Sequence, residues 1–273
     1  MGTKFHIDFT KVLVNDFFGW INWRKNGMDT ILDIGSGPGH TVHEAILPKL
    51  PQNFSKLVLS DISPEMVALQ KEEFAGNPKI SCEILDIGSD ISEDLLCRLG
   101  TFDHITSIAC LMWVPDQQKA MDNIYKLLKP GGDCFLSIVA KSPAMDAITS
   151  VCEKPRWKDF FIGWKDFYVF PYNIDIEEAK LKALNYMKKA GFVETKADLR
   201  HNPFLFESDQ EKENFLRSRP NKFSKDVSTK EEEEIFQDRL EVFDKFNLGN
   251  YRDNSNKIEK LNSHVILYGK KPV

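Results

Sequence analysis

Hydrophobic positions in the first half of the chain form short apolar runs that alternate with segments of helical spacing. The runs are typical of strands buried on both faces of a sheet, and they cover 30–35, 55–63, 79–87, 102–110 and 129–140. Helices are predicted between them over 40–47, ending near Pro48, and over 92–98. Another helix should begin at Ser63 and Pro64, as N-cap and first helical residue, and a fourth should follow Asp116. This alternation indicates a parallel sheet with helices on both faces.

The flanking segments follow other patterns. A helix is predicted over 9–21, with one apolar face made by Phe9, Val12, Leu13, Phe17, Trp20 and Ile21. Residues 141–175 are crowded with aromatic side chains and lack a clean period. The remaining predicted elements are a helix over 176–190 that stops at Gly191, a strand over 192–206, a charged helical stretch over 208–249 and a closing strand over 264–271.

A length of 273 residues suits one α/β domain with a sizeable core. We therefore expect a Rossmann-like, mostly parallel seven-stranded sheet with helices on both faces and a helical, aromatic cap insertion. The whole chain, 1–273, is predicted to be a single domain. Its cofactor-binding core covers 28–140, and its cap segments cover 141–175 and 208–250.

Composition narrows the class of protein. A net charge of −5, without a basic stripe, disfavours a nucleic-acid binder. The five cysteines form no CxxC pairs and no metal-ligand spacing with histidine, so we expect reduced thiols, a cytoplasmic location and no metal site. The N-terminus lacks the pattern of a signal peptide, and no apolar run is long enough to span a membrane.

The segment "ILDIGSGPGH" carries three glycines at alternate positions, Gly35, Gly37 and Gly39. A chain gives up side chains in this way where the backbone turns tightly or approaches another group closely. A dinucleotide-binding loop has the spacing GxGxxG, whereas this loop reads GxGxG. Asp61 ends the second predicted strand, 22 residues after Gly39, where a carboxylate accepts hydrogen bonds from both ribose hydroxyls.

Two later motifs complete this pattern. Asp86 and Ile87 end the third predicted strand, where an acceptor beside an apolar side chain suits the amine and face of adenine. The segment "LLKPGG" then leads into the fifth strand, and a dinucleotide site does not require it. With "LDIGSGPG", "LSDIS" and "EILDIG", it makes the sequence resemble the class I S-adenosylmethionine-dependent methyltransferases over roughly 28–140.

That resemblance implies a cofactor and the residues that bind it. The glycines would make room for S-adenosylmethionine, with no phosphate to cradle, and Asp33 would help to position its amino group. The implied cofactor-binding set is Asp33, Gly35, Gly37, Gly39, Asp61, Ile62, Asp86, Ile87 and Ile108. Because the cofactor carries its own leaving group, the protein mainly supplies orientation.

The stretch 102–140, with "CLMW" and "NIYKLLKPGGDC", is similar to the insect juvenile hormone acid O-methyltransferases. This resemblance implies juvenile hormone biosynthesis, by methyl transfer to the carboxylate of a farnesoic acid or juvenile hormone acid. Trp113 matches the family's loop tryptophan, whose indole N–H helps to bind that carboxylate. His6 stands at or beside a family glutamine that holds the same group. Trp113 and His6 are therefore the catalytic candidates.

The predicted substrate-contacting residues are Cys110, Trp113, Trp164 and Phe167. Trp164 and Phe167, with Trp157, Phe160 and Phe161, would suit a cap over a long apolar substrate, or they would simply pack between cap and sheet. Cys110 would line the methyl site or be an ordinary small buried residue. His104, inside a strand, is expected to be a structural histidine.

Other functions stay open at this stage. A methyltransferase acting on an amine or hydroxyl would often need a base, and His6 is the candidate. An inactive relative that binds the cofactor or a terpenoid is a second alternative, although the cofactor motifs are intact. The GxGxG spacing and "LKPGG" count against a nucleotide-binding oxidoreductase. The sequence does not indicate the oligomeric state.

Overall fold

The computed structural model describes residues 4–167, 170–203, 206, 208–219, 223–246 and 261–273. Within these residues, seven strands form one sheet in the order β3-β2-β1-β4-β5-β7-β6. The strands are β1 (Thr30–Ile34), β2 (Lys56–Asp61), β3 (Ile80–Ile84), β4 (Phe102–Ile108), β5 (Leu128–Lys141), β6 (Val193–Pro203) and β7 (Leu261–Lys270). Neighbours from β3 to β5 pair in parallel, and β7 is antiparallel to both β5 and β6. The predicted fold class is confirmed.

Strand register brings the predicted cofactor motifs to one edge of the sheet. Asp33 of β1 lies opposite Leu59 of β2 and Thr106 of β4. Asp61, the last residue of β2, pairs with Ile84 at the end of β3. Because all four strands run in the same direction, the loops that follow them gather at their carboxyl ends, where α/β sheets bind ligands.

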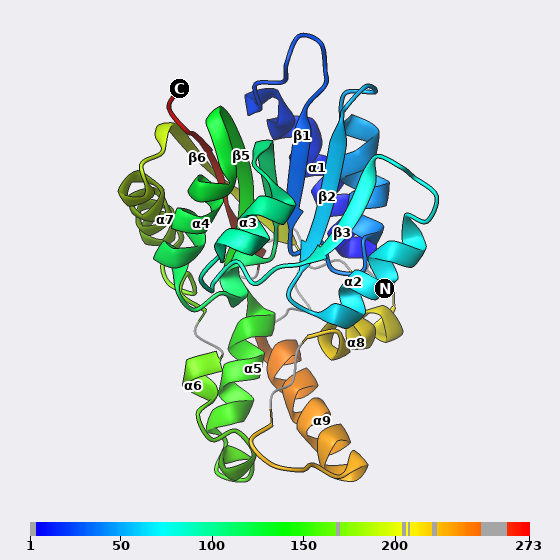
Figure 1. Cartoon of the computed structure of the whole chain (residues 1–273). Helices are drawn as coiled ribbons and strands as arrows, with labels where there is room; N and C mark the ends of the chain where they lie inside the picture. The colour runs from blue at the N-terminus through cyan, green and yellow to red at the C-terminus, as the bar shows by residue number, and fades with distance from the viewer. Residues whose placement is uncertain (1–3, 168–169, 204–205, 207, 220–222, 247–260) are drawn as a thin grey trace.

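Helices cover both faces of the sheet (Figure 1). On one face lie α1 (Lys4–Phe17), the η2 turn (Val42–Ile46) and the end of α2 (Pro64–Glu73). On the other lie α3 (Glu93–Leu99), α4 (Gln117–Leu127) and α7 (Ile176–Ala190). Apolar side chains alternate between the two faces along each strand: Ile31 packs under α1 and Leu32 on the opposite side.

Side-chain caps explain where several of these helices begin. Ser63 accepts a hydrogen bond from the Met66 backbone N–H, and Asp116 accepts one from Lys119. Such a cap stabilises a helix start by about 1 kcal/mol. At the C-terminal end of α7, Gly191 adopts a left-handed conformation with φ 102° and ends the helix, as predicted.

The cap consists of helices beyond the carboxyl ends of the strands. It contains α5 (Pro143–Glu153), the short α6 (Trp164–Phe167), α8 (Asp209–Arg217) and α9 (Thr229–Phe246). In Figure 1, α5, α6 and α9 extend below the sheet, and α8 lies between them and α1. α5, α8 and α9 share a small apolar cluster made by Ala144, Ala147, Phe215, Leu216, Phe236 and Phe243.

The structure corrects three details of the local predictions. The first helix spans Lys4–Phe17 rather than 9–21, and it buries Val14 while Val12 is 50% exposed.

Residues 40–49 are helical near the predicted place, but mainly as a π-helix (Val42–Ile46) and a 3₁₀ turn (Leu47–Lys49) that contains Pro48. Proline is tolerated in the first turn of a helix. Residues 143–153 form α5, a helix within the predicted cap segment whose position was not predicted.

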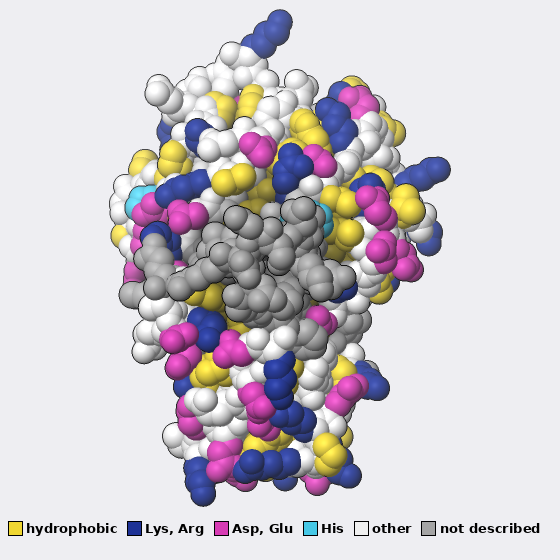
Figure 2. Space-filling view, turned by 180° about the vertical axis from the view of Figure 1, so that it is seen from behind, with side chains coloured by type: hydrophobic (Ala, Val, Ile, Leu, Met, Phe, Trp, Pro, Cys, Tyr) yellow, Lys and Arg dark blue, Asp and Glu magenta, His cyan; other side chains and the backbone are white. Residues whose placement is uncertain are grey.

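The surface carries charges of both signs. On the face shown in Figure 2, Lys and Arg side chains lie intermixed with Asp and Glu over both the sheet and the cap. Among the described residues, no helix is both long and apolar enough to cross a membrane.

Candidate functional site

The glycine loop after β1 folds over the end of β2. The backbone N–H groups of Gly35 and Ser36 both donate to the Ser60 carbonyl, at 2.8 and 2.9 Å. The Gly37 N–H donates to Oδ2 of Asp61 at 3.0 Å, and the Ser63 N–H donates to Oδ1 at 3.0 Å. Asp61 therefore ties the loop to the end of β2, and each of its oxygens keeps a lone pair for another donor.

The three loop glycines are required for different reasons. All have positive φ, at 72°, 56° and 94° for Gly35, Gly37 and Gly39. A Cβ on Gly35 would lie 2.2 Å from Cys110 Sγ, and one on Gly39 would lie 2.8 Å from the Phe74 ring. A Cβ on Gly37 would meet no heavy atom within 4 Å. Of the three, Gly37 is the one whose bare backbone faces open space.

Asp33 lies beneath this loop. Its side chain is buried and accepts hydrogen bonds from the hydroxyls of Ser36 and Thr106, both at 2.6 Å. Burial raises the pKa of Asp33 to about 6, although the two hydroxyls counteract that rise and Asp61 adds to it. The carboxyl group braces the loop through Ser36.

The remaining predicted cofactor-binding residues line the same edge of the sheet. Ile62 is 62% exposed, whereas Ile87 is buried and Ile108 half-buried. Asp86 is exposed and accepts from the Gly88 N–H at 2.9 Å and the Ser89 hydroxyl at 2.6 Å. These bonds fix the turn that follows β3.

Gln70, on α2, is a further residue of this site that the sequence did not indicate. Its side chain is buried, and its amide donates to the Gly37 carbonyl at 2.6 Å. The loop is thus held by Asp61 on its N–H side and by Gln70 on its carbonyl side. Only the tertiary contact between α2 and the loop identifies this role.

The segment after β4 contains Cys110 and Trp113, two of the residues predicted to contact the substrate. Ala109 has φ 53°, a strained conformation for a residue with a side chain, and Cys110 follows it. Burial and the nearby carboxylates of Asp61 and Asp33 raise the pKa of the Cys110 thiol to about 12, so it is not a thiolate near neutral pH. The short 3₁₀ turn η4 (Leu111–Trp113) follows.

Gln117, at the start of α4, holds this turn in place. Its buried amide donates to the carbonyls of Leu111 at 2.6 Å and Val114 at 2.5 Å. The Trp113 ring packs edge-on against Phe170, with centroids 5.2 Å apart. Trp113 is therefore fixed from both sides.

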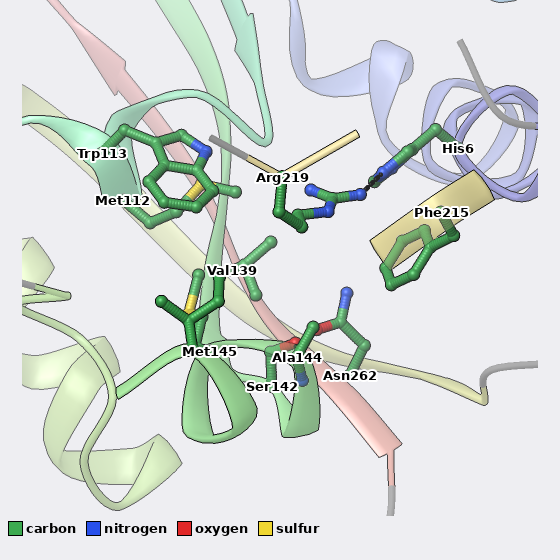
Figure 3. A pocket seen from close by; sticks show the side chains of 11 residues that line it. His6, Met112, Trp113, Val139, Ser142, Ala144, Met145, Phe215, Arg219 and Asn262 are labelled. Carbon is green, nitrogen blue, oxygen red and sulfur yellow. Dashed lines mark hydrogen bonds between the residues drawn. The ribbon is translucent and has the colours of Figure 1, made fainter. Parts of the chain in front are cut away.

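A pocket opens beside Trp113, between the sheet and the cap (Figure 3). His6 of α1 and Trp113 both line it, so the two catalytic candidates come together although 107 positions separate them in the chain. The other lining residues are Met112, Val139, Ser142, Ala144, Met145, Ile148, Phe215, Arg219 and Asn262. The pocket has about 300 Å³ of empty volume, part of it open to solvent, and its enclosed part has room for about one water.

The pocket lining is mainly apolar, with the neutral polar side chains of Ser142 and Asn262, and with Arg219 as its cation. None of its eleven lining residues is acidic. In Figure 3, the Arg219 guanidinium lies between Trp113 and His6, with the indole nitrogen on the side of the ring that faces it. Arg219 follows α8 and belongs to no motif, so the sequence did not indicate it.

Of the cap aromatic residues considered for substrate contact, Trp157, Phe161 and Trp164 do not line this pocket. Trp157 and Phe161 are buried in the main core, and the Trp157 N–H donates to Asp238 at 2.5 Å. Trp164 is half-buried against that core, and the Phe167 side chain lies outside the described residues. Cys110 contacts the glycine loop instead. In the described part of the chain, no three His, Cys, Asp or Glu side chains converge as a metal site.

Comparison with known proteins agrees with this geometry. Residues 32–134 match the methyltransferase domain family. The chain is 33% identical over 201 residues to juvenile hormone acid O-methyltransferase of Drosophila melanogaster, covering 72% of this chain and 65% of that protein. It is 33% identical over 172 residues to the Bombyx mori protein of the same name, covering 63% and 59%. The matches thus span about three fifths of each relative.

A solved structure has the same fold at low sequence identity. Phosphoethanolamine N-methyltransferase 2 from Haemonchus contortus, in complex with S-adenosyl-L-methionine, superposes with a TM-score of 0.52 at 16% identity. The match covers 96% of this chain and 52% of that one. This likeness establishes the architecture.

Proposed function

Given that this chain carries a methyltransferase domain across residues 32–134, we propose that it binds S-adenosylmethionine and methylates the carboxylate of a hydrophobic acid. The favoured substrate is of the farnesoic acid or juvenile hormone acid type, and the product is a methyl ester. Two relatives named as juvenile hormone acid O-methyltransferases support this choice. The observation that carries the proposal is the pocket lining, which is mainly apolar and includes one arginine and no acidic residue.

The residues at the carboxyl edge of the sheet fit the cofactor. Gly37 offers bare backbone next to open space, where a side chain would reduce the room for a ligand. Asp61 has lone pairs left for two ribose hydroxyls. The exposed Ile62 beside it offers an apolar surface for the adenine ring of the cofactor. When bound, S-adenosylmethionine supplies a methyl group activated by its sulfonium.

The acceptor side needs a carboxylate binder more than a base. A carboxylic acid is already ionised near pH 7, so its oxygen requires only orientation, loss of water and hydrogen-bond donors. The Trp113 indole N–H and the Arg219 guanidinium provide donors at one end of the pocket. Met112, Met145 and Phe215 provide apolar contact for the chain of the acid.

The arrangement of His6 disfavours an amine or hydroxyl acceptor. Burial, with the charge of Arg219 and the neighbouring His264, lowers the pKa of His6 to about 3. A base with such a low pKa removes protons poorly near neutral pH. Its Nε2 is also engaged by Arg219 at 2.7 Å.

A methyl-transfer assay tests the proposal. Purified protein would be incubated with radiolabelled S-adenosylmethionine and farnesoic acid, juvenile hormone acid, lauric acid, or a panel of amines and phenols. We expect label in a base-labile methyl ester of a terpenoid acid. Label only in an amine or ether product would assign the alternative acceptor, and cofactor binding without any product would indicate a binding protein.

Gly37→Ala tests the cofactor side. We expect S-adenosylmethionine affinity to fall by about tenfold, because a methyl group would intrude on the ligand side of the loop. The positive φ alone should lower folding stability by about 1–2 kcal/mol. Calorimetric binding and urea unfolding measure the two effects. Gly76→Ala is the matched control, since Gly76 also has positive φ and open space around its Cα. Equal affinities in the two variants would contradict the assignment.

Trp113→Phe tests the acceptor side. The ring is retained and only the indole donor is lost, so turnover on farnesoic acid should fall by about 10-fold to 100-fold. Affinity for S-adenosylmethionine should stay within about twofold, because the donor faces the acceptor pocket. Trp20→Phe, on the α1 side of the sheet, serves as the control. Unchanged turnover in Trp113→Phe would remove this residue from the reaction.

A further inference from the structure

We propose that Arg219 binds the carboxylate of the substrate, and that His6 acts through it as a positioning residue. The inference deepens the proposed function and rests on it. It also assigns His6 a different role from the one expected by analogy with the family glutamine, which contacts the carboxylate directly.

The contact between the two side chains defines their roles. A terminal nitrogen of Arg219 lies 2.7 Å from Nε2 of His6. Because a guanidinium has only donors, the imidazole nitrogen must accept, and it must therefore be unprotonated. The lowered pKa of His6 agrees with a neutral ring. A neutral His6 cannot donate from this nitrogen to a substrate, but it can fix the direction of the guanidinium.

The residues that line the pocket do not neutralise the charge of Arg219, so a negatively charged ligand could do so. Burial lowers the pKa of Arg219 to about 10, so the group is still a cation near neutral pH. No carboxylate lines the pocket, and within the described chain the buried Nε of Arg219 has no hydrogen-bond partner. A buried cation without a counter-ion is costly, and a bound carboxylate would offset that cost.

The plane of the guanidinium is set by packing. Its central carbon lies 4.2 Å from the centre of the Phe215 ring, and that ring is buried in the cap cluster. His6 packs near the same ring, with centroids 5.8 Å apart. A planar guanidinium held in this way suits two-pronged contact with a carboxylate, which a lysine would not reproduce.

The position of Arg219 predicts how the acid would be oriented in the pocket, with its carboxylate near Trp113 and its apolar chain among apolar side chains. Figure 3 shows the guanidinium beside Trp113, with Met112, Val139 of β5 and Met145 of the cap helix α5 lining the pocket. A carboxylate on Arg219 would also lie on the side of the indole that carries its N–H. The apolar remainder of the substrate would then contact methionine and valine side chains rather than charged groups.

Ligand binding tests this assignment independently of turnover. Dissociation constants would be measured by tryptophan fluorescence for farnesoate and for farnesol, the neutral alcohol of the same chain. In Arg219→Gln, we expect farnesoate binding to weaken by about 10-fold to 100-fold, as for loss of a charge-assisted pair. Farnesol binding should change by less than about threefold.

His6 variants separate positioning from direct contact. His6→Gln keeps an acceptor for the guanidinium and should bind farnesoate within about threefold of the parent, whereas His6→Leu should weaken it by about tenfold. Arg217→Gln is the matched control, because Arg217 is exposed, lies two residues away and pairs with Glu233. It should leave both ligands unaffected.

The outcomes distinguish the two proposals. If the parent protein binds farnesoate no more tightly than farnesol, or if Arg219→Gln leaves farnesoate binding unchanged, the inference about Arg219 is wrong. If farnesoate binding depends on Arg219 but no methyl ester is formed, the inference stands and the proposed methyl transfer fails. Equal loss in His6→Gln and His6→Leu would overturn the role of His6.

Discussion

Asp61→Ala is expected to weaken S-adenosylmethionine binding by about 100-fold or more, the larger of the two cofactor-side effects. In this structure the carboxylate accepts from the Gly37 and Ser63 N–H groups, and each of its oxygens keeps a lone pair for a further donor. Losing one hydrogen bond to a charged group is worth about 1.5–3 kcal/mol, and loss of loop order adds to it. Isothermal titration calorimetry measures the change.

Variants of nearby acids make this prediction specific. Asp61→Asn keeps one acceptor oxygen, so its affinity for S-adenosylmethionine should lie between those of the parent and Asp61→Ala. Asp90→Ala removes an exposed carboxylate that pairs with Lys119, and it should bind the cofactor normally. Circular dichroism would check that each variant remains folded. Parental affinity in a folded Asp61→Ala protein would exclude Asp61 from the cofactor site.

Local patterns predicted which segments meet at the carboxyl edge of the sheet. A short apolar run followed by glycines, or a strand that ends in aspartate, can be recognised from about ten consecutive residues. The sheet then brings such segments together automatically, because parallel strands share one carboxyl edge. Asp33, Asp61 and Asp86 could be predicted for this reason.

The glycine loop shows a limit of that approach. The three glycines look equivalent in the sequence, yet Gly35 makes room for Cys110 and Gly39 for Phe74. Both neighbours come from other elements, so spacing alone could not separate a packing glycine from one that faces a ligand.

The pocket proposed for the acceptor was harder to predict because its lining residues come from distant segments. His6, Trp113 and Arg219 belong to α1, the turn after β4 and the turn after α8. Family resemblance suggested Trp113 and His6, but nothing in the local sequence marks Arg219. α5 was missed because its buried alanines, 144 and 147, contact α9 rather than the sheet, and the flanking aromatic residues mask the period.

The amino-terminal edge of the sheet supplies the largest expected effect on stability. His104 was expected to be structural, and this is confirmed: its buried ring contacts Asp133 at 2.6 Å and Asp29 at 2.9 Å. Trp23 packs edge-on against it, with centroids 4.6 Å apart. His104→Leu would leave two buried carboxylates without their shared cation. We expect a loss of about 3–5 kcal/mol in the free energy of unfolding at pH 6, measured in urea.

The same group predicts how stability depends on pH. Burial opposes the charge on His104, but its hydrogen bonds and attraction to Asp133 and Asp29 outweigh burial and raise its pKa. Stability from a raised histidine pKa is fully present below the unfolded value of about 6.5 and is lost as pH rises through the folded value. The parent should therefore lose this contribution as pH rises above about 6.5, whereas His104→Leu should lack that slope. His40→Leu, a change at a half-exposed histidine, should retain it, and a parental slope in His104→Leu would assign the titration to another group.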